Sequence, residues 1–471
     1  MMRATGFLAA LIAPALAAAA GRAAPGIEAR LLTAVSTYHS KPGDRIEAAI
    51  SGRACVQGGE AIPDGSILRG EVGHLHKVGL GLIHESARLE LRFDELAFPD
   101  GRTFPGAGWV VGVDNARERV DRQGNIRGVR ATGTVYSKIG QRIAFDSLEN
   151  PYALVPVFIL QAAVFSFPDP EIEYGPGAEL YLAIDAPETI GDLSPCAVPD
   201  AGPGPAEQTA LRRIADALPY WSYSKRQPQP MDAVNLLYVG SRQEVERAFA
   251  AAGWASAVPN SVRAGLKAIR AVAQSGAYED APMRTLLLDG AQPVFSLQKS
   301  LNTFAKRDHL RIWERSGEFQ GRPVWASAAT KDLGVTFSLK PFGFTHKIEN
   351  NIDLEREMVV GDLAFTNCVD SVVYIDRSPA DAVSGVYREG IRSDWRLAVV
   401  VLNACESPRI VQGESALLRP WRGVRLIRRV TLTARNHFIR DNIFYRAGQG
   451  AWIGGKALRR WQISRSAAGK S

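Results

Sequence analysis

The pattern of hydrophobic and polar positions changes partway along the chain. Between residues 27 and 193, short apolar segments alternate with turns that contain glycine, proline or an Asp-Gly pair. Residues 87–93 alternate apolar with charged side chains, which is the period-two pattern of a strand with one face in solvent. Several such strands at this spacing predict an all-β domain, either a barrel or a sandwich.

A segment rich in proline and glycine, residues 194–207, predicts a linker, and the pattern after it mixes helices with strands. Ser241 followed by Glu244 is a capping-box sequence, and Gly253 is placed to end the same helix. The predicted helices are 208–218, 241–252, 261–275 and 352–363, and the predicted strands are 234–239, 284–289, 307–314, 322–329, 334–340 and 369–375. The predicted fold class is multidomain: an N-terminal all-β barrel or sandwich over 27–193, followed by an α+β domain over 208–380. Strand-like segments are predicted to continue through a strand-rich extension, 381–471.

The N-terminus, residues 1–24, has the pattern of a secretory signal peptide, with Arg3 before an apolar run over 6–20 and small residues after it. A membrane-spanning helix needs about 20 apolar residues, so this run is short for an anchor. The sequence therefore predicts export to the periplasm or cell envelope. An oxidising compartment permits disulfides, and the order of the four cysteines suggests Cys55–Cys196 and Cys368–Cys405. Buried free thiols are the alternative.

The formal net charge of +7 is concentrated at the C-terminal end. Residues 409–471 hold 14 basic and 2 acidic residues, whereas the rest of the chain is mildly acidic. Tryptophans are interleaved with these arginines, which in an exported protein suits an anionic lipid surface better than nucleic acid. The alternative is a solvated face with core tryptophans. A second apolar run, 152–167, is either a buried strand pair or a hairpin that touches a membrane.

Two clusters of polar residues are candidates for chemistry. A strand over 307–313 would place Arg307, His309 and Arg311 on one face, where two guanidiniums beside an imidazole could bind an anion. The alternative is a solvated strand face whose arginines pair with carboxylates elsewhere. Near the helix at 352, Asp353 and Glu355 suit the helix dipole, and with His309 and His346 they form the candidate acid/base or metal set. The spacing is not that of a zincin, and nucleotide-binding and α/β-hydrolase motifs are absent from the sequence, so no metal or cofactor is predicted.

The second half resembles the LssY C-terminal domain, which is found in bacterial envelope proteins. This domain is often appended to membrane-embedded phosphatase-like modules. The matching strings are Asn235–Gly240, Gly253–Trp254, Tyr278 with Ala281–Pro282, Arg307–Trp313, Val324–Trp325 with Asp332, Thr345–His346 and Asp353–Arg356. The family prefers aspartate where this chain has Glu349 and Asn351, which weakens a metal site at those positions. The resemblance implies an envelope setting and no specific activity.

The first half resembles the β-barrel domain of TrbI-like scaffold proteins of conjugative secretion channels. The matching strings are Ile62–Ser66 with Gly70, Leu89–Phe93, Phe98–Gly101 and Tyr174–Leu180. In those scaffolds a membrane-inserted projection lies late in the barrel, near the position of 152–167. The leading hypothesis is therefore an exported binding or scaffold component of envelope secretion or phospholipid-related processes, with anionic lipid or envelope secretion proteins as partners. The alternative is a hydrolase of phosphorylated or lipid substrates that uses the His/Asp/Glu set.

Overall fold

The structure is a computed structural model of the 471-residue chain. The residues that it describes are 26–56, 61–80, 84–114, 117–130, 170–185, 193–196, 198–224, 230–257, 283–299, 307–339, 342–377, 391–409 and 420–435, and the isolated residues 448, 451, 454–455 and 458–459. The apolar run at 152–167 and the predicted helix at 261–275 lie outside the described residues.

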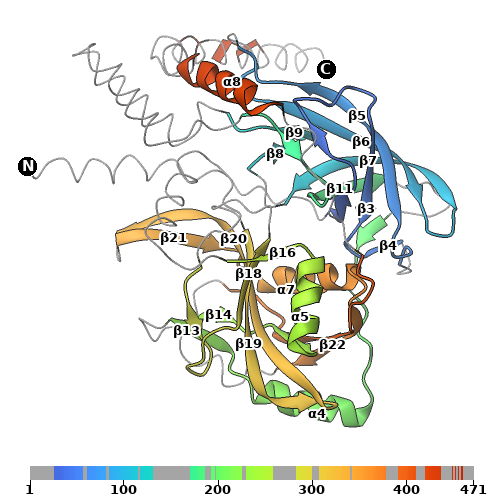
Figure 1. Ribbon diagram of the computed structural model, residues 1–471, viewed down its shortest axis with the longest axis vertical. Helices are drawn as coiled ribbons and strands as arrows, with labels where there is room; N and C mark the ends of the chain where they lie inside the picture. The colour runs from blue at the N-terminus through green and yellow to red at the C-terminus, as the bar shows by residue number, and fades with distance from the viewer. Residues whose placement is uncertain are drawn as a thin grey trace, which may run out of the picture.

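The N-terminal domain is a closed, six-stranded antiparallel β-barrel (Figure 1). The strands pair in the order β5–β3–β1–β11–β7–β6, and β6 pairs with β5 to close the barrel. They are β1 (Ile27–Leu31), β3 (Arg45–Ile50), β5 (Ile67–His76), β6 (Arg88–Ala97), β7 (Thr103–Val113) and β11 (Glu179–Asp185), and the short strands β9 (Asn125–Arg127) and β8 (Arg119–Val120) extend the sheet from β6. The all-β prediction is confirmed, and the barrel is the correct alternative.

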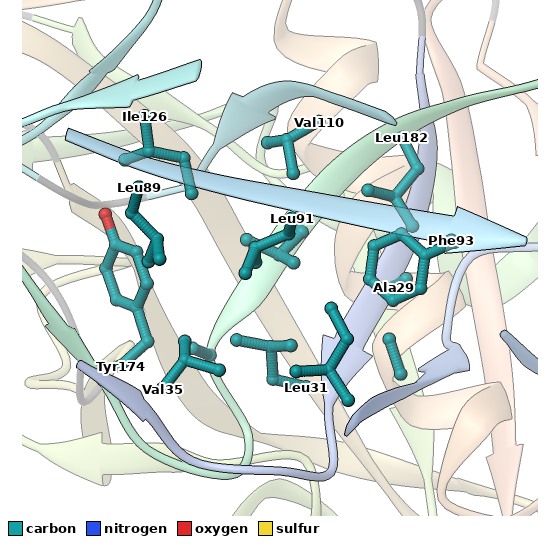
Figure 2. Close-up of a cluster of buried hydrophobic side chains, with 14 of the residues drawn as sticks. Ala29, Leu31, Val35, Leu89, Leu91, Phe93, Val110, Ile126, Tyr174 and Leu182 are labelled. Atoms are coloured by element: carbon teal, nitrogen blue, oxygen red, sulfur yellow. The ribbon is translucent and has the colours of Figure 1, made fainter. Parts of the chain in front are cut away.

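The alternation along β6 sets the barrel interior. Leu89, Leu91 and Phe93 are almost fully buried and pack with Ala29 and Leu31 of β1 (Figure 2). The charged residues between them point to the outside of the barrel, as the period of two requires. The barrel core is therefore built by the pattern that predicted these strands.

Two short strand pairs flank the barrel. The strand β2 (Val35–Ser36) pairs with β10 (Glu173–Tyr174), and β4 (Ala54–Val56) pairs with β12 (Leu193–Pro195). A disulfide joins Cys55 of β4 to Cys196, the residue after β12. The segment that leaves the barrel is therefore linked covalently to a strand beside it. This bond confirms the first predicted cysteine pair.

The second domain is built on a mixed sheet in the order β16–β18–β19–β20–β15–β23–β22, with β21 paired to the far part of β20. Its strands are β15 (Leu236–Val239), β16 (Trp254–Ser256), β18 (Phe295–Lys299), β19 (Arg307–Phe319), β20 (Arg322–Leu339), β21 (Phe342–Ile348), β22 (Val369–Asp376) and β23 (Arg396–Leu402). A smaller sheet joins β13 (Trp221–Ser224) to β14 (Pro230–Ala233) and β17 (Leu286–Leu287). The strands and helices confirm the prediction of an α+β region after the barrel.

One prediction within this sheet is wrong. The sequence pattern separated strands 322–329 and 334–340, but β20 runs through both. The polar residues Thr330, Lys331 and Asp332 interrupt the apolar pattern, yet their backbones pair in register with β19. A strand with polar groups on both faces does not show the period expected from a one-sided core.

Helices cover both faces of the sheet. The helices α5 (Arg242–Ala251) and α7 (Ile352–Phe365) pack on one face, and α4 (Pro205–Asp216) packs on the other (Figure 1). The Ser241 side chain accepts a hydrogen bond from the Glu244 backbone, and the Glu244 carboxylate accepts one from the Ser241 backbone. This confirms the predicted capping box.

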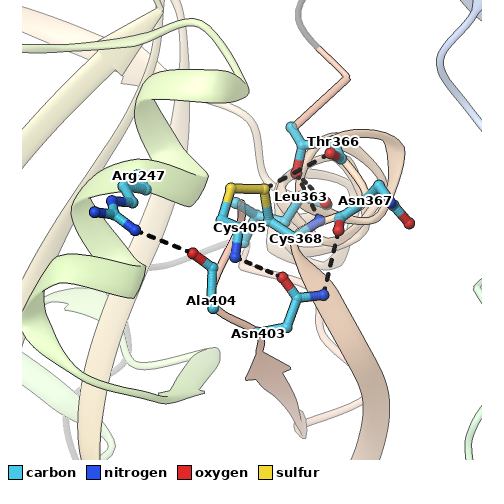
Figure 3. The surroundings of a disulfide bond; sticks show 8 residues. All are labelled: Arg247, Leu363, Thr366, Asn367, Cys368, Asn403, Ala404 and Cys405. Atoms are coloured by element: carbon cyan, nitrogen blue, oxygen red, sulfur yellow. Dashed lines mark hydrogen bonds between the residues drawn. A yellow bond between two sulfur atoms is a disulfide. The ribbon is translucent and has the colours of Figure 1, made fainter. Parts of the chain in front are cut away.

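A second disulfide, between Cys368 and Cys405, confirms the other predicted cysteine pair (Figure 3). It joins the start of β22 to the segment that follows β23, and the Asn403 side chain donates a hydrogen bond to the Asn367 carbonyl beside it. Free cysteines are absent from the described residues.

The basic C-terminal segment differs from its prediction. A strand-rich extension was predicted over 381–471, and β23 agrees with it, but residues Arg422–Arg435 form the helix α8 beside the barrel (Figure 1). Arginine and leucine are good helix formers, and the apolar residues of this segment recur at a helical period. In the described part of the chain, no helix is long and apolar enough to cross a membrane.

Candidate functional site

The main concentration of buried charge lies where the barrel meets the second domain. On β1 and β11 the inward positions fill the barrel core, and the outward positions are Glu28, Arg30, Glu179 and Tyr181. Arg30 and Glu179 are nevertheless 3% and 6% exposed, because the second domain covers them. We call the charged groups at this contact the interdomain cluster.

One half of the interdomain cluster is centred on Asp362 of α7. Its two oxygens lie 2.5 Å from an Arg30 nitrogen and 2.5 Å from Lys299 Nζ of β18, and Trp254 Nε1 donates a hydrogen bond of 3.0 Å. Lys299 Nζ also lies 2.6 Å from Glu179. Burial alone would lower the pKa of Lys299, but the charges of Asp362 and Glu179 raise it, so the ammonium form is favoured.

The same place holds a group of acids that resembles a metal site. Oxygens of Glu28, Glu179 and Asp362 all lie within 4.8 Å of one another. Two of these carboxylates already bind Lys299, and Arg30 lies 3.3 Å from Glu179 as well as against Asp362. The two cations supply the positive charge that a metal ion would otherwise supply. The geometry therefore favours a set of ion pairs between the two domains over a metal centre.

The other half of the cluster is centred on Lys331 of β20. Its ammonium lies 2.9 Å from Asp114 at the end of β7 and 3.1 Å from Asp308 of β19, and Tyr181 donates a hydrogen bond of 3.1 Å to Asp114. Burial, followed by the charge of Asp308, raises the pKa of Glu355 well above its ordinary value. Glu355 therefore retains its proton at higher pH than an exposed glutamate.

The strand face that was predicted to carry Arg307, His309 and Arg311 exists, but carboxylates of the same domain face its arginines. Arg307 Nε donates a hydrogen bond of 2.9 Å to Asp332, and Arg311 donates one of 2.6 Å to Asp232 of β14. Both arginines are at most 5% exposed. The alternation of β19 is thus confirmed. The arginines pair with carboxylates from other strands, as the alternative expected, but the face is buried and not solvated.

His309, between these arginines, belongs to a short chain of polar groups. Its Nε2 lies 3.0 Å from the Thr330 hydroxyl, and its Nδ1 lies 3.8 Å from Asp332. The three residues are 6%, 3% and 2% exposed, respectively. A hydroxyl, an imidazole and a carboxylate in this order could relay a proton, although the longer contact is beyond hydrogen-bond distance.

The structure separates the other candidate residues. Glu355 approaches Asp308, which faces the opposite side of β19 from His309, so these two candidates do not share a site. Asp353 accepts hydrogen bonds from the Ser393 hydroxyl and the Asp394 backbone, and so fixes the start of α7. The backbone of His346 pairs with Val335 of β20, and its side chain lies outside the described part of the structure.

Several strings that resemble the LssY C-terminal domain have structural partners in this fold. The Asn235 side chain donates to the Ala329 carbonyl and accepts from the Ala329 backbone, which joins β15 to β20. Trp325 Nε1 donates a hydrogen bond of 2.7 Å to the Gly240 carbonyl. Arg356, almost fully buried, donates to Asp394 at 2.6 Å and also contacts Asp353. These motif residues hold the sheet and α7 together.

Sequence reasoning missed the interdomain cluster. Glu28, Arg30 and Glu179 alternate with apolar residues, which is also the pattern of a strand face in water. Lys299 lies between neutral residues, and Lys331 is followed directly by Asp332, so neither lysine is marked as part of a larger charged group in the sequence. One available signal was the pair of acids within the mainly apolar helix α7, because Glu355 and Asp362 interrupt its buried face.

Comparison with known proteins identifies one region of the chain. The model of the family described as LssY C-terminus matches residues 217–390. No curated protein matches the chain. The match includes the three strands of the small sheet, α5, the long hairpin of β19 and β20, and α7. Residues 217–390 are therefore a LssY C-terminal family domain, joined here to an N-terminal β-barrel.

Proposed function

We propose that the protein is an exported binding or scaffold component of the cell envelope, in which the barrel and the LssY C-terminal domain act as one rigid unit. The observation that carries the proposal is the interdomain cluster, in which barrel residues form buried ion pairs with β18 and α7 and a partly buried one with β20. Buried ion pairs demand defined geometry, so they fix the orientation of the two domains better than an exposed contact would. A fixed orientation is what a scaffold needs to hold two partners at a set distance.

The signal-like N-terminus and the cysteine chemistry support the export part of the proposal. Disulfides persist mainly in oxidising compartments, and both cysteine pairs are placed to form them. The resemblance of the barrel to TrbI-like scaffolds supports a role in envelope secretion, and that of the second domain supports an envelope setting.

Cell fractionation with thiol trapping tests export. In a bacterial host, the full chain should enter the periplasmic fraction and resist maleimide labelling until it is reduced. A variant without residues 2–24 should stay in the cytoplasm with labelled cysteines. Cytoplasmic retention of the full chain with reduced thiols would contradict the proposal.

A hydrolase acting on phosphorylated or lipid substrates is the second candidate, and the Thr330–His309–Asp332 chain is the observation that favours it. Phosphate release from phospholipids by purified protein tests it directly. Turnover that disappears in the His309→Ala/His346→Ala variant, while the melting temperature is kept, would favour the enzyme. No turnover by the wild type, with no metal found by elemental analysis, would leave the scaffold proposal as the better account.

A further inference from the structure

The helix α8 contacts the barrel through arginines and turns apolar side chains outward. Arg428 Nε donates a hydrogen bond of 3.1 Å to the buried carboxylate of Glu171, and its Nη2 donates one of 2.5 Å to the Val78 carbonyl. Arg435 donates to the neighbouring Gly79 carbonyl. Leu432, between them on the same face, belongs to the barrel core cluster.

The opposite face of α8 is apolar and exposed. At 100° per residue, Leu426 and Val430 lie on the side away from Arg428 and Leu432. The exposed fractions are 57% for Leu426, 68% for Ile427 and 38% for Val430. A surface helix of a globular protein normally buries its apolar stripe, so this helix has the reverse arrangement.

The charge of α8 indicates what covers this face. Five of its fourteen residues are arginine and none is acidic. Trp421, immediately before the helix, is 77% exposed. Leu80 is 58% exposed, and it follows Gly79, whose carbonyl accepts the hydrogen bond from Arg435. An exposed apolar stripe with tryptophan and arginine around it is the composition of helices that lie in the interface of an anionic bilayer.

We propose that α8 is an interfacial helix that places Leu426, Ile427 and Val430 in the headgroup region of a membrane containing anionic phospholipids. The barrel holds the helix through Arg428 and Arg435, so the apolar face is presented without unfolding of the domain. The exposed Arg422 lies beside the lipid phosphates, and Trp421 lies at the interface. This inference goes beyond the scaffold role and does not depend on it.

Flotation of the full chain with vesicles tests the inference. Wild-type protein should float with vesicles of phosphatidylethanolamine and phosphatidylglycerol and much less with phosphatidylcholine alone, and raised salt should weaken binding. The Leu426→Asp/Ile427→Asp variant should bind the anionic vesicles about 100-fold more weakly, because burial of each side chain is worth about tenfold or more.

The matched control is Leu354→Asp, since Leu354 is 58% exposed on α7 and its variant adds a charge at an equally exposed leucine. This variant should float like the wild type, and all variants should keep the wild-type melting temperature because the changed side chains are exposed. Wild-type protein that does not float would overturn the inference and leave a protein partner for this face. Equal flotation of the Leu426→Asp/Ile427→Asp variant, or equal binding to phosphatidylcholine, would also overturn it.

Discussion

The ion pairs around Asp362 should contribute strongly to stability, and Asp362→Asn isolates their charge with almost no change in volume. The carboxylate lies 2.5 Å from both Arg30 and Lys299 and accepts a third hydrogen bond from Trp254. After the substitution, two buried cations would share Glu179 as their remaining bonded acid, and the new amide would direct a donor toward one of them.

Removal of one partner from a buried ion pair costs about 3–5 kcal/mol, because the other charge stays buried without compensation. Asp362, Arg30 and Lys299 are 1–3% exposed, so solvent screening reduces the penalty little. For a domain of this size we expect the melting temperature to fall by about 10 °C. Differential scanning calorimetry or the change in tryptophan fluorescence on heating would measure it.

The control substitution is Asp100→Asn, which removes the same charge from a surface pair. Asp100 and Arg102 form an ion pair of 2.8 Å with side chains that are 49% and 62% exposed, and such pairs contribute little. The second test is the Asp362→Asn/Lys299→Met variant, which should be less destabilised than the sum of its single variants. If Asp362→Asn melts like Asp100→Asn, or if the two changes at the cluster are additive, the reasoning is wrong.

Three further predictions concern other parts of the molecule. The Cys368→Ser/Cys405→Ser variant should lose about 4 kcal/mol of stability in denaturant unfolding, because the bond closes a loop of 37 residues. The difference between the wild type and the variant should disappear when both proteins are measured under reducing conditions, because the Cys55–Cys196 bond is then broken in both. Glu355, whose pKa is raised by burial and then by Asp308, binds its proton more tightly when folded, so its contribution to stability is fully present below the unfolded pKa and is lost as pH rises through the folded pKa. Glu355→Gln should therefore have a higher melting temperature than the wild type at pH 8, and its melting temperature should fall less between pH 5 and pH 8. A variant with a lower melting temperature and the same pH dependence as the wild type would refute this. Arg428→Gln should increase amide hydrogen exchange in α8 while the barrel strands keep their protection, and unchanged exchange in α8 would show that this arginine does not hold the helix.

Local patterns predicted much of the fold because the relevant forces act between near neighbours. The alternation of Leu89, Leu91 and Phe93 defined a barrel strand, and the Ser241–Glu244 spacing defined a helix start. The helix α8 was missed because residues 381–471 were predicted as one strand-rich extension. The apolar residues of α8 nevertheless recur at the helical period.

The candidate site was predicted only in part, because burial depends on contacts between distant segments. The pattern placed Arg307, His309 and Arg311 on one face correctly, but it could not supply the partner of each arginine from another strand. The outward charges of the barrel, such as Arg30, follow the pattern of a solvated face. Their function as a domain contact becomes visible only when the second domain covers them.

The position of β23 has a consequence for how the second domain is completed. Leu236 of β15 pairs in parallel with Ala398 of β23. A strand near the start of this domain can therefore complete its pairing only after β23, which follows the end of the family match, has been synthesised. Pairing across such a sequence separation is slow, and it cannot occur until most of the polypeptide has been synthesised. A fragment cut at residue 390, where the family match ends, would lack β23 and leave β15 and β22 without the strand between them. Recombinant work on the LssY C-terminal domain should therefore extend past Cys405.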